Sequence, residues 1–433
     1  MARAVVLLTA WGLANTILAA EFSPSRLQQW IDETSPGTTL EVPAGSYEGD
    51  IIIAKPMHLI GAPGAAIRGS GLGKTVSIQA PDVTLEGFSI TGSGRNLMKD
   101  DAAVHVTADR ATIARNRITG SLHGIYLKQA NDCRITGNVI EGIGGDLGNL
   151  QLGDDPENCD ASPSVPGRPG NGIHQWNCER TEITGNTIRH TRDGIYFSFA
   201  HHGLIRSNTI SQGRYGLHYM YSDDNTFEHN RFFSNAGGAA VMFSERTVIR
   251  ENWFGDNRGS RATGLILLSV DDSVVERNRI ERNALGLSLN QCNRNRFVGN
   301  TVERNHGGLR FGGNSDENLF SMNSFLGNLH PAEMTGESGS NRWMSAGVGN
   351  RWDHVVPLDF DADGIGDWPH RELDVLGHLR REFPPVSLLA SSPALQLVRL
   401  AHQRAALPGL NTIQDDAPLL GTGPSRDRLL SIP

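Results

Sequence analysis

The chain has 433 residues, of which 50 are glycine and 30 asparagine, and only 6% are aromatic. Its 39 basic and 47 acidic side chains give a formal charge of −8, which excludes the basic surface that nucleic-acid-binding proteins need. Apolar residues recur at regular places, which argues against intrinsic disorder, and the length fits several domains or one repetitive body.

Residues 1–20 have the pattern of a secretory signal peptide. Arg3 supplies an early positive charge, an apolar run follows, and Ala19 and Ala20 are small residues of the kind that precede a cleavage site. The alternative is a membrane anchor, but Asn15 interrupts the run and a spanning helix needs about 20 apolar residues. We therefore expect export with cleavage, to the periplasm or outside the cell.

Four cysteines would then lie in an oxidising compartment: Cys133, Cys159, Cys178 and Cys292. Three pairings are possible and the sequence does not choose between them. A bridge from Cys159 to Cys178 across an insertion is one alternative, whereas Cys133 and Cys292 are expected to be small buried residues. No C-x-x-C spacing occurs, which argues against a thiolate metal site.

Residues 21–110 precede the regular part of the chain and resemble degenerate first coils of a solenoid. The run from Leu40 to Tyr47 is typical of the entry into such a fold. Because the terminal repeats of a solenoid must shield its open end, we predict that this segment forms the N-terminal coils and cap.

Residues 111–355 carry two repeated motifs that run in phase. A glycine followed by alternating apolar residues recurs from Gly124 to Gly308, and an Asn-x-apolar triplet recurs ten times with most steps 22 or 23 residues long. The triplets begin at Asn116, Asn138, Asn186, Asn208, Asn230, Asn252, Asn278, Asn300, Asn323 and Asn350. Repetition of this kind indicates stacked units.

Each unit predicts short strands and tight turns, because Gly and Asn tolerate positive φ. Such strands cannot bury both faces alone, so successive units must stack. We predict an all-β, right-handed parallel β-helix with coils of about 22 residues, in which each Asn amide bonds to the Asn amide one coil above. The first and third residues after each glycine then point inward, and the second and fourth point outward.

Two segments depart from the repeat. The interval from Asn138 to Asn186 is 26 residues longer than one period, and the excess, a Gly/Pro/Asp-rich stretch at about 144–170, predicts a projecting loop. Residues 356–433 contain an acidic turn, an amphipathic helix from Pro393 to Arg404 and a tail.

The outward positions indicate a copper site. Met220 and Met242 are one period apart, so their thioethers should be neighbours, with His218 on the same strand face. Thioether and imidazole together favour Cu(I). His174 occupies the same outward column, and His201 and His202 follow the preceding strand. The alternative is that the two methionines pack under a neighbouring loop.

Exported β-helices also include enzymes that cleave polysaccharides, which makes a lyase or hydrolase the alternative function. Hydrolysis needs two carboxylates about 5–9.5 Å apart. The outward columns after the glycines contain no Asp or Glu, so we expect no enzymatic activity. A surface adhesion solenoid is a third class.

An acidic turn indicates a possible calcium site. Asp359, Asp361 and Asp363 alternate, Gly364 stands sixth and Asp367 ninth, as at the start of a calcium loop. His370 occupies the twelfth position, where a bidentate Glu is expected. A solvated acidic turn is the alternative.

Six segments are particular enough to indicate a family. They are Gly170–His174, Arg192–Phe197, Arg214–Met220, Gly349–Trp352, Asp361–Asp367 and Ser391–Leu400. Together they resemble the NosD family over nearly the whole mature chain. The rung pattern alone would be unspecific, because many β-helix proteins share it.

This resemblance implies a periplasmic copper-handling protein needed to mature nitrous oxide reductase. Its implied partners are an ABC transporter, made of a membrane subunit and an ATPase, a membrane-anchored copper chaperone as donor, and the reductase apoprotein as acceptor. The resemblance strengthens the assignment of His218, Met220 and Met242 to Cu(I). The helix from Pro393 to Arg404 would contact the membrane subunit; the alternative is a cap over the last coil.

Overall fold

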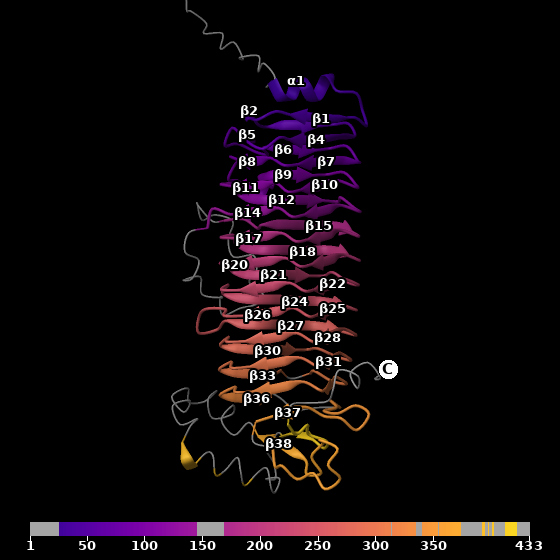
Figure 1. Ribbon diagram of the computed structural model, residues 1–433, viewed down its shortest axis with the longest axis vertical. Coiled ribbons are helices and arrows are strands. Elements are labelled where there is room, and N and C mark those ends of the chain that lie inside the picture. Colours follow the sequence, from indigo (N-terminus) through magenta and orange to yellow (C-terminus); the bar gives the residue numbers. More distant parts are fainter. Residues whose placement is uncertain are drawn as a thin grey trace, which may run out of the picture.

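A computed structural model describes residues 26–144, 169–312, 314–334, 340–353, 355–373, 392–394, 397, 401 and 412–421. Figure 1 shows an elongated stack of coils with helix α1 (Arg26–Glu33) at one end and strand β38 (His370–Leu373) at the other. Each strand of the stack pairs in parallel with the strand one coil away, and three sheets run along its length. The predicted parallel β-helix is therefore confirmed.

Three parallel sheets make up the walls of the solenoid, and each is named here by its first strand. The β1 sheet contains β1 (Thr39–Val42), β4 (Met57–Gly61), β7 (Val83–Glu86), β10 (Thr112–Ala114), β13 (Arg134–Thr136), β16 (Glu182–Thr184), β19 (Leu204–Arg206), β22 (Thr226–Glu228), β25 (Val248–Arg250), β28 (Val274–Glu276), β31 (Arg296–Val298) and β34 (Leu319–Ser321). The β2 sheet contains β2 (Gly45–Glu48), β5 (Ala65–Arg68), β8 (Ser89–Thr91), β11 (Arg117–Thr119), β14 (Val139–Glu141), β17 (Thr187–Arg189), β20 (Thr209–Ser211), β23 (Arg231–Phe233), β26 (Trp253–Gly255), β29 (Arg279–Glu281), β32 (Thr301–Glu303), β35 (Ser324–Leu326) and β37 (Arg351–Trp352).

The β3 sheet has the longest strands and carries the candidate site. It contains β3 (Ile51–Ile53), β6 (Val76–Ile78), β9 (Ala102–Val106), β12 (His123–Lys128), β15 (Ile173–Glu179), β18 (Asp193–His201), β21 (Tyr215–Met220), β24 (Gly237–Glu245), β27 (Thr263–Asp271), β30 (Leu285–Asn290), β33 (Gly307–Phe311) and β36 (His330–Met334). Outside the three sheets lie a short 3-10 helix (Leu97–Lys99) and an antiparallel pair, β38 and β39 (Thr412–Asp415).

The core is one continuous column of inward side chains. Alternate residues of each strand point inward and stack on their equivalents in the next coil, as in the pair Phe232 and Phe254, whose ring centroids are 5.3 Å apart. Leu27 and Ile31 on α1 are buried against the first coil. The helix thus covers apolar surface that the end of the stack would otherwise expose.

The repeated asparagines form the predicted ladder. In each coil the backbone N–H and the side-chain amide of one asparagine both donate to the side-chain oxygen of the asparagine one coil further along, as Asn208 does to Asn230 at 2.9 and 3.0 Å. The amides of all ten are buried. At the last one, Asn350, the backbone N–H donates to Asp415 Oδ2 at 2.6 Å.

The insertion does not interrupt the stack. Strand β12 pairs directly with β15, and β14 pairs with β17, so the coils on either side of it are in register. Cys159 lies outside the described residues, and so does nearly all of the predicted loop at about 144–170. A bridge from Cys159 to Cys178 is wrong, because Cys178 is a free thiol buried in the core. Cys133 and Cys292 are buried, as expected.

The two ends of the chain are described only in part. The predicted signal peptide, residues 1–20, lies outside the described residues. Of the predicted helix from Pro393 to Arg404, the residues Pro393, Ala394, Leu397 and Ala401 are described and are helical. In the described part of the chain we find no helix with both the length and the apolarity needed to cross a membrane.

We predict that Asn208→Ala lowers the free energy of unfolding by about 3 kcal/mol, because it leaves buried donors and acceptors on Asn186, Ile183 and Asn230 without partners. Urea-induced unfolding followed by circular dichroism measures this change. The control Arg117→Ala removes an exposed side chain at the equivalent strand position three coils earlier and should cost less than about 1 kcal/mol. Equal losses in the two variants would contradict a stabilising ladder.

Candidate metal centre and its aromatic column

An alternating column of imidazole and phenol rings runs along the outer face of the β3 sheet. Its members occupy one register position on five consecutive strands: His105, Tyr126, His174, Tyr196 and His218. Successive ring centroids lie 5.5, 4.3, 4.5 and 5.0 Å apart. Parallel, in-register pairing brings these rings together although they are 21 or more residues apart in the chain.

Asn171 fixes the orientation of two histidines in this column region. Its backbone N–H donates to His123 Nδ1 at 3.0 Å, and its side-chain amide donates to His174 Nδ1 at 3.1 Å. Burial lowers the pKa of His123 to about 4 and holds that of His174 well below its usual range. Both rings are therefore neutral near pH 7, and in this arrangement the Nδ1 lone pair of His174 is already engaged.

His218 is held by a buried ion pair. Asp193 Oδ2 lies 3.1 Å from His218 Nδ1, and Arg214 donates two hydrogen bonds to the same carboxylate at 2.8 and 2.6 Å. Burial alone would raise the pKa of Asp193, but Arg214 and His218 outweigh it and keep the pKa well below its usual range. Arg214 Nη2 also lies 3.1 Å from Nδ1. Because Arg214 already binds the carboxylate twice, the same carboxylate is placed to hold the His218 ring through Nδ1.

Met220, the last residue of β21, and Met242, within β24, are register partners. Met242 is 1% exposed and Met220 is half-buried. They belong to an apolar cluster on the outer face that contains Tyr215, Ala240, Met242 and Leu268, with Met220, Phe243 and Ile266 at its edge. The fold thus brings two thioethers to one face, two residues along the strand from His218, and leaves one of them accessible.

His201 and His202 follow a bend in β18 at Phe199, whose φ is 52°. His201 Nδ1 accepts a hydrogen bond from the Asp223 N–H at 3.0 Å. None of the contacts made by the described residues joins either histidine to Met220 or Met242. Of the candidate copper ligands, the structure therefore brings His218, Met220 and Met242 onto one face, and it places His174 two coils away in the same column.

The outward positions after the repeat glycines contain no Asp or Glu, but the coil beyond the last glycine motif adds one acid to the same column. Glu333 on β36 is in register with Arg310, whose Nη2 lies 3.1 Å from Glu333 Oε2. The coil of Glu333 has no glycine motif, so the repeat did not reveal it. The repeat pattern also did not reveal the roles of Asp193 and Arg214. Asp193 directly precedes Gly194, and Arg214 directly precedes Tyr215.

The acidic turn places Asp359, Asp361 and Asp363 together, with one carboxylate oxygen from each within 4.8 Å of the others. Asp367 accepts a hydrogen bond from the Phe360 N–H at 2.5 Å. His370, in the position of the missing Glu, is buried and stacks on Trp352. Calcium binding by this turn stays a prediction.

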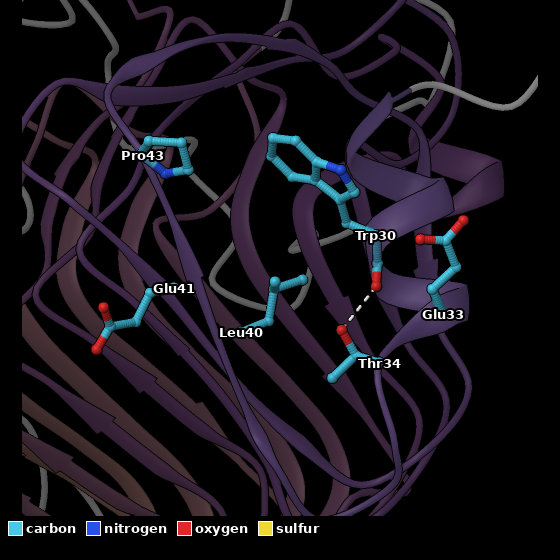
Figure 2. A pocket seen from close by; sticks show the side chains of 6 residues that line it. All are labelled: Trp30, Glu33, Thr34, Leu40, Glu41 and Pro43. Carbon is cyan, nitrogen blue, oxygen red and sulfur yellow. Dashed lines mark hydrogen bonds between the residues drawn. The ribbon is translucent and has the colours of Figure 1, made fainter.

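A separate pocket lies beside α1, remote in the fold from the aromatic column. It has a volume of about 430 Å³. Figure 2 shows the Trp30 ring above Leu40 and level with Pro43, with Glu33 and Glu41 on opposite sides. None of the candidate metal ligands lines it, so it is no part of the metal centre.

The neutral state of His123 predicts a pH-dependent stability. Its pKa is about 4 in the folded protein and about 6.5 in an unfolded chain. Between these two pH values the unfolded state binds more protons than the folded state. The free energy of unfolding therefore falls as the pH falls. We expect His123 alone to account for a loss of about 2 kcal/mol between pH 7 and pH 5 in urea-induced unfolding. The variant His123→Asn, which keeps an acceptor for the Asn171 N–H, should be less pH-dependent by that amount. The same pH dependence in both proteins would overturn this.

Solved structures with the same architecture include proteins of several kinds. The Dettilon tailspike protein superimposes with a TM-score of 0.52 at 15% identity, over 79% of this chain and 67% of that one. A PL6 alginate lyase in complex with a trisaccharide does so with a TM-score of 0.52 at 14% identity, over 72% of this chain and 84% of that one. At such low identity the similarity concerns the fold alone.

Sequence comparison is more specific. A family described as "Periplasmic copper-binding protein (NosD)" matches residues 156–355. A relative from Pseudomonas aeruginosa strain PAO1, named "Probable ABC transporter binding protein NosD", is 33% identical over 393 residues, which cover 87% of each chain. A relative of the same name from Stutzerimonas stutzeri is 32% identical over 396 residues, 88% of this chain and 86% of that one. The chain therefore belongs to the NosD family.

Proposed function

We propose that this protein is a periplasmic copper-handling accessory protein that binds Cu(I) and works with an ABC transporter to mature nitrous oxide reductase. The family description as a periplasmic copper-binding protein supports the location and the metal. The names of the two relatives support association with an ABC transporter. The observation that carries the proposal is the pair of register-matched thioethers, Met220 and Met242, beside an imidazole oriented by a buried carboxylate.

The donor set fits Cu(I) for chemical reasons. Thioethers are soft, uncharged ligands that select Cu(I), and imidazole suits copper as well. The Asp193 carboxylate, 3.1 Å from His218 Nδ1, orients the imidazole ring, which is how outer-shell groups prepare histidine ligands. The apolar cluster around Met242 restricts access of water to the ion. Both thioether sulfurs are uncharged ligands, so they do not change the charge of the bound ion.

The proposed role is that of a carrier without catalytic chemistry. The buried Met242 would hold the ion on the protein side. The accessible Met220 would be the first ligand that a ligand of the partner protein replaces. Copper would arrive from a membrane-anchored chaperone and leave for the reductase apoprotein. Turnover of the transporter, made of a membrane subunit and an ATPase, would change the geometry of the site so that the metal is released. The segment from Pro393 to Arg404 is the proposed contact with the membrane subunit; its Leu397 is 66% exposed.

Among the residues that the structure describes, the contacts on the outer face of the β3 sheet do not favour the alternative of a polysaccharide lyase or hydrolase. The carboxylates of Asp193 and Glu333 each face an arginine, Arg214 and Arg310, rather than a second carboxylate. Hydrolysis requires two carboxylates that flank the same bond.

We predict that the double variant Met220→Leu and Met242→Leu binds Cu(I) at least tenfold more weakly than the parent, because leucine keeps the volume and removes the sulfur. Anaerobic titration against a competing Cu(I) chelator measures the affinity. The matched control is Met98→Leu, since Met98 is 77% exposed on the 3-10 helix and should leave the affinity unchanged. Unaltered binding by the double variant would disprove the site.

A further inference from the structure

Three aromatic rings, two of them exposed and one half-buried, form a second stack beside the metal centre. Phe199, Tyr221 and Phe243 occupy the same bend at the edge of the β3 sheet on consecutive coils. Their ring centroids lie 5.3 and 5.0 Å apart and their planes differ by 10° and 11°. Phe199 is 47% and Tyr221 43% exposed, so the stack, here called the edge ladder, is in contact with water.

The backbone does not require aromatic residues at this bend. On the flanking coils the same position holds polar residues, and all of them share the left-handed conformation of the edge ladder, with φ between 50° and 54°. These residues are Gln129, Asn177, Ser269 and Gln291. Ser269 and Gln291 are hydrogen-bonded to one another at 3.0 Å, so a polar ladder serves this bend equally well. Within the described part of this bend, aromatic residues occur only on the coils of Ser198, Met220 and Met242.

The edge ladder is continuous with the thioether pair. Tyr221 and Phe243 directly follow Met220 and Met242 in the chain, and Phe243 packs at the edge of the apolar cluster that contains Met242. Because the rings stack face to face, their faces cover one another and their edges form the outer surface. Stacking of a sugar ring needs an open aromatic face, whereas a row of ring edges offers a flat apolar strip of the kind found at the centre of protein interfaces.

We propose that the edge ladder is the docking surface for a protein that carries Cu(I) at an apolar patch. The proposal rests on the copper function proposed above. Soft-bound Cu(I) passes between two proteins by ligand exchange, in which donor and acceptor ligands contact the same ion. A partner that reaches Met220 must cover its surroundings, and the edge ladder is the exposed apolar part of those surroundings. Exposed aromatic side chains also supply much of the binding energy at protein interfaces.

The test exchanges the two exposed rings of the edge ladder for polar residues. The double variant Phe199→Asn and Tyr221→Gln uses residues that this bend already accepts on other coils, and it leaves Phe243, which packs against the cluster around Met242, unchanged. Anaerobic stopped-flow measurements follow Cu(I) uptake from two donors: the Cu(I)-loaded membrane-anchored chaperone in detergent, and the Cu(I)–bicinchoninate complex. We expect transfer from the chaperone to slow at least tenfold, with unchanged uptake from bicinchoninate and unchanged Cu(I) affinity. Gln291→Ala, two coils beyond Phe243, is the matched control and should change neither rate.

Two results would overturn the proposal. Transfer from the chaperone at the parent's rate would show that the edge ladder is not the docking surface. Equal slowing from both donors would show that it shapes the metal site and binds no partner. The single variant Tyr221→Gln, with circular dichroism and urea unfolding of every variant, separates a lost surface from a lost fold. A parent protein that takes Cu(I) from neither donor would contradict the copper function itself, and the docking proposal with it.

Discussion

The buried asparagine ladder is the constraint on which the rest of the molecule depends. Each rung satisfies the side chain and the backbone N–H of one asparagine with a single amide oxygen one coil further along. A shift of one coil by one residue would leave these groups buried without partners, at a cost of about 1–3 kcal/mol for each group. The ladder therefore sets the register of the coils from Asn116 to Asn350, and the sheets inherit that register there.

A fixed register turns spacing along the chain into geometry. Side chains one period apart become neighbours about 4.8 Å apart, whatever their chemistry. The imidazole and phenol column, the thioether pair and the edge ladder all arise from this rule, and none of them needs a loop to be positioned. Gln129 and Gln291 occupy the bend of the edge ladder on other coils and have the same backbone conformation without an aromatic ring. Comparison with these coils shows which features the fold itself requires.

This rule also explains how much the sequence could predict. The repeat was enough for the fold, for the ladder and for placing Met220 beside Met242, because all of these follow from period and alternation. It was not enough for Asp193, whose role depends on the bend that precedes its strand, or for Glu333, whose coil lacks the glycine motif. The free, buried state of Cys178 follows from its inward position on a strand, which the spacing to Cys159 could not reveal.

The end of the ladder joins the solenoid to its C-terminal segment. The last asparagine, Asn350, needs an acceptor and no further coil supplies one. Asp415, 65 residues later, provides it from β39, and its carboxylate also accepts from Trp352 Nε1 at 2.9 Å. Burial raises the pKa of this carboxyl, and the hydrogen bonds from Asn350 and Trp352 counteract that rise. The acceptor that closes the ladder thus belongs to the segment that follows the proposed transporter contact, so displacement of this segment would expose the last rung and weaken the register of the coils behind it.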